Sequence, residues 1–206
     1  MSTRLTPVRI ADDIFEMRAD TPRQAQKLAS ALRAEEMVED VVAGLASVCI
    51  KFNPRQQDKI ADWLGAFALS PKDNESAAAP LTIDIRYGGA DGPDFAMICE
   101  ALSLSPEALI AMHTDQNHIV EMIGFTPGFA YISGLPDQAK VPRLSNPRSR
   151  VPAGSVGISA AFTGIYSLAG PGGWPLIGRT AQTLFDPDAE TPFLLQPGQR
   201  LKFKAV

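Results

Sequence analysis

The sequence predicts an α+β protein with two domains, and two features of the chain predict it. In the first 90 residues, stretches of alternating apolar residues are interleaved with stretches in which apolar residues recur at helical spacing. From residue 124 to 180, Gly and Pro recur every few residues, which leaves room for short strands and tight turns but for few helices. We therefore expect a ferredoxin-like split βαβ domain over residues 1–89 and a β-barrel or sandwich, with short leading helices, over residues 90–206.

The first domain opens with two short strands and a helix. Residues 5–9 and 14–17 are the strands, on either side of an acidic turn. The helix begins after Thr21, because this side chain can cap the first free N–H groups and Pro22 suits the first helical position. The apolar stripe of the helix consists of Ala25, Leu28, Ala29 and Leu32.

The sequence of the rest of this domain predicts two more strands, a helix and a last strand. Residues 38–42 and 45–52 are strands on either side of a turn. The helix after them carries a stripe made of Ile60, Trp63, Leu64 and Phe67. Residues 70–80 are polar or small and predict a loop, and residues 81–87 alternate again. The resulting order of strand, helix, strand, strand, helix and strand is typical of a ferredoxin-like fold.

The second domain begins after the glycine pair Gly88-Gly89, which ends the strand pattern. Two short helices follow, the first with a stripe from Phe95 to Leu102 and the second capped at Ser105-Pro106. Residues 119–123 then form the first strand of the Gly- and Pro-rich half.

Composition narrows the class of protein. The formal net charge of -4 and the isoelectric point near 5.2 argue against a nucleic-acid-binding surface. Cys49 and Cys99 are the only cysteines, and because both lie in apolar patterns we interpret them as reduced core thiols. The first 13 residues contain no apolar run of a signal peptide, and no run of 18 apolar residues exists, so we expect a soluble cytoplasmic protein.

Residues 173–180 approach the pattern of a phosphate-binding P-loop, with Arg179 in the place of the usual lysine. A P-loop needs a buried strand before it and a helix after it, so that the helix N-terminus faces the phosphates. Here Pro171 and two glycines precede the segment, and Asp186-Pro187 would end a following helix at once. The sequence therefore favours a turn followed by a strand.

The two histidines, His113 and His118, are five residues apart and so do not share a helical face. No Cys or carboxylate cluster completes a metal set with them, and we expect no metal site. His113 ends a predicted helix, where the helix dipole would stabilise an imidazolium; the alternative is a catalytic base. Ser155 has no second histidine placed to build a triad, so we interpret it as a turn or strand residue.

Arginines are the most suggestive charged feature of the second domain. Arg143, Arg148 and Arg150 lie among prolines, which stiffen the backbone. A guanidinium pairs bidentately with a carboxylate or a phosphate, so these side chains fit contact with an anionic substrate; salt bridges to a partner protein or a solvated loop are the alternatives. The aromatic residues nearby should mostly fill the barrel interior, with one or two at a pocket mouth: Phe125, Phe129, Tyr131, Phe162, Tyr166 and Trp174.

Five motifs of this half occur in a recognisable order: GFTPGFAYISGLP, PRxxxPRxRVPAGSVGI, TGIY, PGGWPLIGRT and LFDP. Together they resemble the allophanate hydrolase subunit 1 family, also called the carboxyltransferase subdomain C/D family, over nearly the whole chain. Its members include the B-type component of 5-oxoprolinase and the sporulation kinase inhibitor KipI. The resemblance implies a small α+β domain followed by a cyclophilin-like β-barrel, in agreement with the division that periodicity predicts.

The resemblance also implies partners and a reaction. Family members work with a larger subunit, known as subunit 2 or the C-type component, and a LamB/YcsF-type protein, the A-type component, takes part in 5-oxoprolinase. That complex cleaves the lactam of 5-oxoproline to glutamate with ATP hydrolysis, and this is our leading hypothesis, with ATP used by the complex. The alternatives are a carboxyltransferase half-module that acts on urea- or allophanate-type amides, and a KipI-like inhibitor of a histidine kinase.

Site residues follow from the family positions that this sequence matches. The expected catalytic residues are His113, Arg150 and Thr163. The expected substrate-binding residues are Arg143, Arg148, Tyr166, Trp174 and Arg179. Two departures from the family pattern lie in this region: Phe162 stands where the family commonly has Gln, which removes a polar contact, and Ser167 follows Tyr166 where the family has Pro. Because no full catalytic set is evident in one chain, we expect a site that a partner protein completes.

Overall fold

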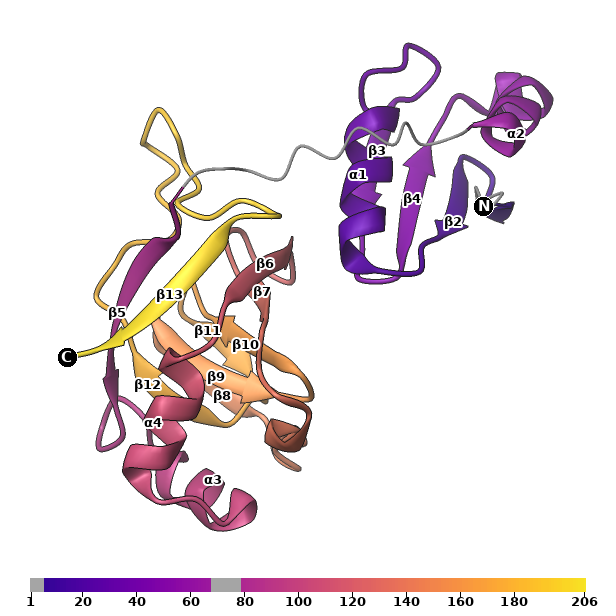
Figure 1. Cartoon of the computed structure of the whole chain (residues 1–206). Coiled ribbons are helices and arrows are strands. Elements are labelled where there is room, and N and C mark those ends of the chain that lie inside the picture. Colours follow the sequence, from indigo (N-terminus) through magenta and orange to yellow (C-terminus); the bar gives the residue numbers. More distant parts are fainter. Residues whose placement is uncertain (1–5, 68–78) are drawn as a thin grey trace. The chain divides into compact units, whose positions relative to one another are not determined.

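A computed structural model describes residues 6–67 and 79–206 of the chain (Figure 1). The chain divides into two compact units, Met1–Glu75 and Ser76–Val206, and each has a hydrophobic core of its own. The expected two-domain α+β organisation is therefore confirmed. The boundary expected at residue 89 is wrong, because the strand at 81–87 belongs to the second unit.

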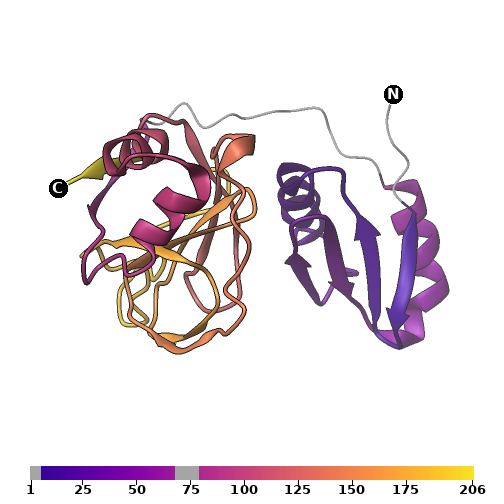
Figure 2. The same cartoon turned by 90° about the horizontal axis from the view of Figure 1, so that it is seen from below.

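The first unit is a four-stranded antiparallel sheet with two helices (Figure 2). The strand order is β1-β2-β4-β3. The elements are β1 (Pro7–Ala11), β2 (Ile14–Arg18), α1 (Pro22–Leu32), β3 (Asp40–Ala43), β4 (Ser47–Lys51), the short 3₁₀ turn Pro54–Gln56 and α2 (Gln57–Ala66).

Its topology contains one split βαβ unit. Strand β4 pairs antiparallel with both β2 and β3, so β2 and β3 run parallel with α1 as their connection. The edge place beside β2 is taken by β1, which precedes the unit in the chain. The prediction that residues 81–87 close this sheet was wrong, because an alternating pattern defines the two faces of a strand but not its neighbours. The predicted loop at 70–80 lies largely outside the described residues.

Helix α1 packs against the sheet as its pattern predicts. The Thr21 hydroxyl accepts a hydrogen bond from the Gln24 N–H at 3.1 Å, and the Gln24 side chain accepts one from the Asp20 N–H. The four residues of the apolar stripe are buried against Met17, Ile50 and Phe52. Burial of each large side chain in this cluster contributes about 1.5–3 kcal/mol, which holds the small unit together.

The second unit is a closed seven-stranded barrel with the order β10-β7-β6-β13-β5-β12-β9. All neighbours are antiparallel except β5 and β13, which are parallel. The barrel strands are β5 (Leu81–Tyr87), β6 (His118–Ile123), β7 (Ala130–Ser133), β9 (Ser155–Ser159), β10 (Phe162–Ile165), β12 (Leu176–Arg179) and β13 (Arg200–Ala205).

A strand ribbon, two helices and a 3₁₀ turn belong to the same unit. A two-stranded ribbon pairs β8 (Arg148–Val151) with β11 (Gly170–Gly172). Helices α3 (Phe95–Leu102) and α4 (Pro106–Thr114) lie together at one end of the barrel, as Figure 1 shows. A 3₁₀ turn covers Asp137–Ala139. The two leading helices were expected, and their bounds agree with the sequence pattern.

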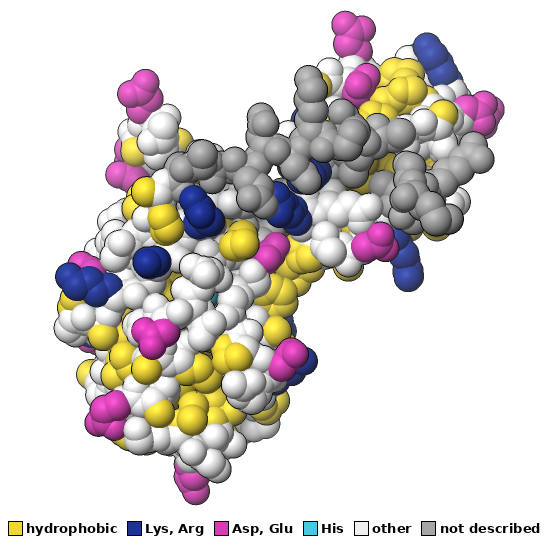
Figure 3. Space-filling model, in the orientation of Figure 1, with side chains coloured by type: hydrophobic (Ala, Val, Ile, Leu, Met, Phe, Trp, Pro, Cys, Tyr) yellow, Lys and Arg dark blue, Asp and Glu magenta, His cyan; other side chains and the backbone are white. Residues whose placement is uncertain are grey.

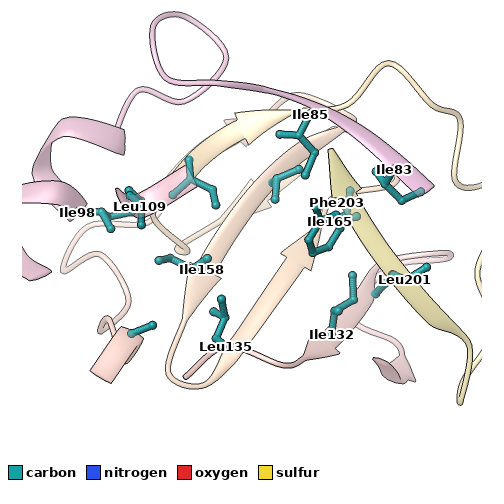
Figure 4. Close-up of a cluster of buried hydrophobic side chains, with 14 of the residues drawn as sticks. Ile83, Ile85, Ile98, Leu109, Ile132, Leu135, Ile158, Ile165, Leu201 and Phe203 are labelled. Carbon is teal, nitrogen blue, oxygen red and sulfur yellow. The ribbon is translucent and has the colours of Figure 1, made fainter. Parts of the chain in front are cut away.

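The barrel interior is filled by apolar side chains that alternate along the strands (Figure 4). On β5, Ile83 and Ile85 are fully buried, whereas Thr82, Asp84 and Arg86 between and beside them are exposed. Leu201 and Phe203 on β13 follow the same rule. Residues of even number on β5 therefore point to the outer face of the barrel, which places Arg86 there.

Several smaller expectations are settled by the fold. The segment 173–180 is a turn followed by strand β12, so the interpretation against a P-loop is confirmed. Ser155 begins strand β9 and is buried, and both cysteines are free thiols. Among the described residues no single helix is long and apolar enough to cross a membrane; α3 and α4 pass that test only as a pair, bent by 91°.

Candidate functional site

The residues predicted for a site fall into two groups. His113 and Thr163 lie inside the barrel unit, whereas the arginines and aromatic residues lie on its outer side. Figure 3 shows charged side chains spread singly over one face, with hydrophobic ones between them, and hardly any histidine surface. Both histidines are buried, in agreement with that view.

His113 is the centre of a buried polar chain. It lies in the last turn of α4, and its ring is 0% exposed. Its Nδ1 is 2.6 Å from the Tyr87 hydroxyl, and its Nε2 is 3.0 Å from Oγ1 of Thr163, which is also 0% exposed. The ring stacks on Phe203 with 4.5 Å between centroids. In either neutral tautomer one ring nitrogen donates and the other accepts, and each hydroxyl can take the complementary role.

His113 is not the charged imidazolium that its place at the end of a helix led us to expect. Burial, together with the neighbouring His118, holds the pKa of His113 well below its usual value. The imidazole is therefore neutral at pH 7, and the imidazolium expected at a helix C-terminus is not formed, because desolvation outweighs the helix dipole. His113 and Thr163, both predicted as site residues, lie in contact, but the sequence did not indicate that both would be shielded from solvent.

His118, on strand β6, lies within hydrogen-bonding distance of two backbone carbonyl groups next to this group of buried polar contacts. Its Nε2 lies 2.7 Å from the carbonyl oxygen of His113, and its Nδ1 lies 3.1 Å from that of Ser133. A neutral ring can donate to only one of them, and the shorter distance assigns the proton to Nε2. Burial lowers the pKa of His118 as well, while the two carbonyl groups act in the opposite direction. The two histidines thus tie α4 to the barrel strands.

Tyr166 and Trp174 belong to a small second core on the outer wall of the barrel. They pack with Phe129, whose ring centroid is 5.0 Å from Tyr166 and 5.7 Å from Trp174. The wall beneath them is made by the paired residues Gly157 and Gly164. A Cβ at Gly164 would come within 2.6 Å of the Trp174 ring, so only glycine lets the indole lie this close to the strand.

The expectation that these aromatic residues fill the barrel interior was wrong. Thr163 and Ile165 point inward, so Gly164 between them faces out, and the aromatic cluster covers that outer side. Phe125 extends from the cluster: its ring is 5.5 Å from Phe129, its side chain is 62% exposed, and its φ is 76°. A large exposed side chain in the left-handed region is an uncommon combination, and backbone strain of this kind gathers at functional sites.

Arg148 forms an ion pair with a carboxylate of this chain and is not free to bind a ligand with all of its N–H groups. Its Nη2 forms an ion pair with Asp94 Oδ1 at 2.7 Å, and Asp94 Oδ2 accepts a hydrogen bond from the Leu176 N–H at 2.7 Å. The Asp94 side chain is 11% exposed and that of Arg148 is 29% exposed. The carboxylate therefore joins the ribbon strand β8 to the barrel strand β12. Arg148 balances a nearly buried charge in this arrangement.

Arg143 and Arg150 are exposed, and neither makes a hydrogen bond or ion pair with a residue that the structure describes. Arg143 lies near the aromatic cluster. Burial raises the pKa of Tyr131 and Tyr166, and the positive charge of Arg143 partly offsets both increases. These two guanidinium groups are thus available at the surface.

Arg179 lines a cavity of about 400 Å³ on the outer side of the barrel unit. The cavity also includes a residue that the sequence pattern did not single out, Arg86 on β5, which is the direct cross-strand partner of Arg179. The alternation of residues 81–87 shows that Arg86 faces outward, but not that β5 pairs with β12. The full lining is Arg86, Ala153, Ser167, Arg179, Thr180, Ala181, Gln182 and Thr183.

Metal-binding side chains do not cluster among the described residues. Over residues 6–67 and 79–206, no three His, Cys, Asp or Glu side chains come close enough to hold a metal ion. The polar groups of the cavity are guanidinium, hydroxyl and amide groups, which suit an anion rather than a cation.

Comparison with known proteins gives the class to which this fold and surface belong. Residues 7–195 match the family described as carboxyltransferase domain, subdomain C and D, and the chain is a member of this family. It is 38% identical to the B-type component of 5-oxoprolinase from Haemophilus influenzae over 187 residues, 88% of this chain and 85% of that protein. It is 43% identical to the corresponding 5-oxoprolinase component of Escherichia coli O157:H7 over 141 residues, 68% of this chain and 62% of the relative.

A solved structure agrees with the fold. The crystal structure of TTHA0988 superimposes with a TM-score of 0.81 at 33% identity, over 94% of this chain but only 40% of the other. The chain therefore spans less than two thirds of the length of the Escherichia coli relative and of TTHA0988. The family resemblance seen in the sequence is confirmed.

Proposed function

We propose that this chain is the B-type component of an ATP-dependent 5-oxoprolinase, a cytoplasmic complex that opens the lactam of 5-oxoproline to glutamate. The observation that carries the proposal is the match to the Haemophilus influenzae component, because it extends over most of both chains. Hydrolysis of an unactivated lactam is difficult, and phosphorylation of the amide oxygen by ATP would supply a leaving group. Such a reaction needs cationic groups that stabilise developing negative charge.

The contacts and exposure of the eight predicted site residues support two different roles for them. Arg143, Arg150 and Arg179 are accessible, and they contact substrate, phosphate or the partner. The other five hold the site in shape through internal contacts: His113, Arg148, Thr163, Tyr166 and Trp174. Since His113 and Thr163 are fully buried, their contribution reaches the substrate through the position of strand β10.

The site is completed by the larger protein of the family pair, and a LamB/YcsF-type protein is the third component. Two features of this chain support an interface. Arg143 and Arg150 present guanidinium groups that no described residue pairs, and Phe125 presents a ring that is 62% exposed on a strained backbone. Aromatic and arginine side chains are the residue types that protein interfaces favour.

Reconstitution tests the proposal. The chain would be purified alone, and also co-expressed with its larger partner and the LamB/YcsF-type protein, and ATP-dependent release of glutamate from 5-oxoproline would be measured. We expect activity only in the assembled complex. Full activity of the isolated chain would refute the shared site, and an assembled complex without glutamate release would refute the reaction.

The family name favours one alternative, a carboxyltransferase half-module that acts on a urea-type amide. A biotin-dependent complex would transfer a carboxyl group without opening a lactam. The same purified complex, given carboxybiotin and urea, distinguishes the two, since we expect no carboxyl transfer.

A further inference from the structure

The cavity beside Arg179 is built from residues of this chain alone, and its polar groups define the kind of ligand it can hold. Strands β5 and β12 supply its two cations, and residues 180–183 supply hydroxyl and amide groups. A volume of about 400 Å³ lies in the range of small-molecule sites.

The two arginines form a like-charge pair. Arg86 and Arg179 are directly opposite each other on neighbouring antiparallel strands. Side chains in such positions extend from the same face with Cβ atoms about 5 Å apart, and two equal charges there destabilise the sheet. A protein that keeps this arrangement in a cavity gains from it when an anion binds between the two charges.

Each guanidinium is held at one atom only. Arg86 Nε pairs with Asp91 Oδ2 at 2.8 Å, and Arg179 Nε donates to the carbonyl oxygen of Ala153 at 2.9 Å. Neither residue uses its Nη groups in a hydrogen bond or ion pair with the part of the chain that the structure describes. The side chains are therefore oriented by Nε, while their outer N–H groups stay available for a ligand.

The backbone near Arg179 is shaped for this contact. Gly154 has a φ of 81°, and a Cβ there would clash with the Thr180 carbonyl oxygen. Thr180 N–H donates to the Gly154 carbonyl oxygen at 2.9 Å. The tight turn thus brings Ala153 against the guanidinium and fixes the direction of Arg179.

The side-chain amide of Gln182 offers a second polar contact for a ligand of this cavity. Its Oε1 is buried and has no hydrogen-bond partner among the described residues, while its Nε2 lies 3.4 Å from the Thr82 carbonyl oxygen. An exchange of the amide atoms would place two oxygens against each other, so the present orientation holds. A buried acceptor without a donor is costly, and a rotation of this cavity-lining side chain that exposes Oε1 would let a ligand N–H satisfy it.

We propose that this cavity binds a small carboxylate that carries a neighbouring N–H group, with the carboxylate between Arg86 and Arg179 and the N–H directed to Gln182. A carboxylate and an N–H on one carbon are what 5-oxoproline offers, and its carboxylate persists in the product glutamate. The identity of this ligand rests on the proposed function. The carboxylate site itself rests only on the cavity, the arginine pair and the unpaired amide.

Calorimetric titration of the isolated full chain tests the site, because every lining residue belongs to this chain. The probes are 5-oxoproline, its uncharged carboxamide and inorganic phosphate. We expect saturable binding of 5-oxoproline, with affinity for the carboxamide lower by about 10- to 100-fold, the effect of losing a charge-assisted contact. No saturable binding of 5-oxoproline, or binding of phosphate tighter than that of 5-oxoproline, would overturn the proposal.

Variants place the ligand in the cavity. Arg86→Gln and Arg179→Gln should each weaken binding of 5-oxoproline by about 10- to 100-fold. Gln182→Leu should weaken it by about 3- to 10-fold, because an amide–carbonyl contact is neutral. Asp91→Asn is the matched control for charge: the amide oxygen can still accept the hydrogen bond from Arg86 Nε and both guanidinium groups remain, so binding should stay within about twofold or become tighter. Unchanged binding in both arginine variants would contradict the proposed position.

The outcome is separable from that of the proposed function. A chain that binds 5-oxoproline through both arginines, within a complex that releases no glutamate, would keep this site and refute the reaction. A complex that is fully active with Arg86→Gln and Arg179→Gln, at an unchanged KM, would keep the reaction and refute this site.

Discussion

The inside of the barrel and its outer arginine pair treat polar groups in opposite ways. Inside, both ring nitrogens of His113 have hydroxyl partners and the ring is fully shielded. Outside, Arg86 and Arg179 face each other across two strands and use only Nε. Buried polar groups with all hydrogen bonds satisfied fix one packing arrangement of a core. Charged groups at a cavity that still have N–H groups without partners can bind a ligand. The first region should govern stability and the second should govern binding.

Removal of the imidazole gives the largest expected loss of stability. His113→Ala leaves a cavity and removes the partner of the buried Thr163 hydroxyl and of the partly buried Tyr87 hydroxyl, so the free energy of unfolding of the barrel unit should fall by about 3 kcal/mol or more. Urea unfolding followed by circular dichroism measures this. Thr163→Val, which unpairs Nε2 but keeps the volume, should cost about 1–3 kcal/mol. A loss below about 0.5 kcal/mol in both variants would refute the structural role of this chain of contacts.

The ion pair between ribbon and barrel comes next. Arg148→Gln leaves the Asp94 carboxylate nearly buried without its cation, and we expect a loss of about 2 kcal/mol by the same unfolding assay. Arg148→Gln combined with Asp94→Asn should recover part of it, because the uncompensated charge is gone. The single variant Asp94→Asn completes the cycle, and a loss in the double variant equal to the sum of the two single losses would show that the pair is not coupled.

Stability should also depend on pH in a defined direction. The pKa of His113 is lowered in the folded state, so below pH 6.5, the ordinary value, the unfolded chain binds the proton and the folded chain does not. Stability is therefore full above pH 6.5 and falls as the pH is lowered, by up to about 1.4 kcal/mol per pH unit for this histidine. Unfolding curves between about pH 7.5 and pH 5 test this. His113→Gln should flatten the slope, and an equal slope in that variant would rule out His113 as its source.

The exposed arginines should show the smallest effect on stability. Arg143→Ala and Arg150→Ala should change the free energy of unfolding by less than about 0.5 kcal/mol, since neither guanidinium pairs with a described residue. In the reconstituted complex, each should weaken association with the partner or catalysis by about 10-fold. A stable variant with wild-type association and activity would remove that arginine from the site.

The contrast between the two regions also explains what the sequence could and could not predict. Periodicity and capping residues located the helices and most strands, because these signals are local, as at Thr21 and along residues 81–87. Strand partners are not local. The pairing of β5 with β12 and β13, instead of with the first sheet, was missed for this reason, and Arg86 was missed with it. Burial of His113 was missed too, because a lone histidine near the end of a helix gives no sign of whether it will face solvent or the core.

If the proposed carboxylate site is correct, Arg86 and Arg179 act on a ligand and contribute little to the stability of the fold. The most direct measurement is kcat/KM for ATP-dependent glutamate release by the complex assembled with Arg179→Gln, beside its unfolding temperature. We expect kcat/KM to fall by about 10- to 100-fold while the unfolding temperature stays close to that of the wild type. A wild-type rate in this variant, or a loss that simply follows unfolding, would contradict this role for the arginine pair.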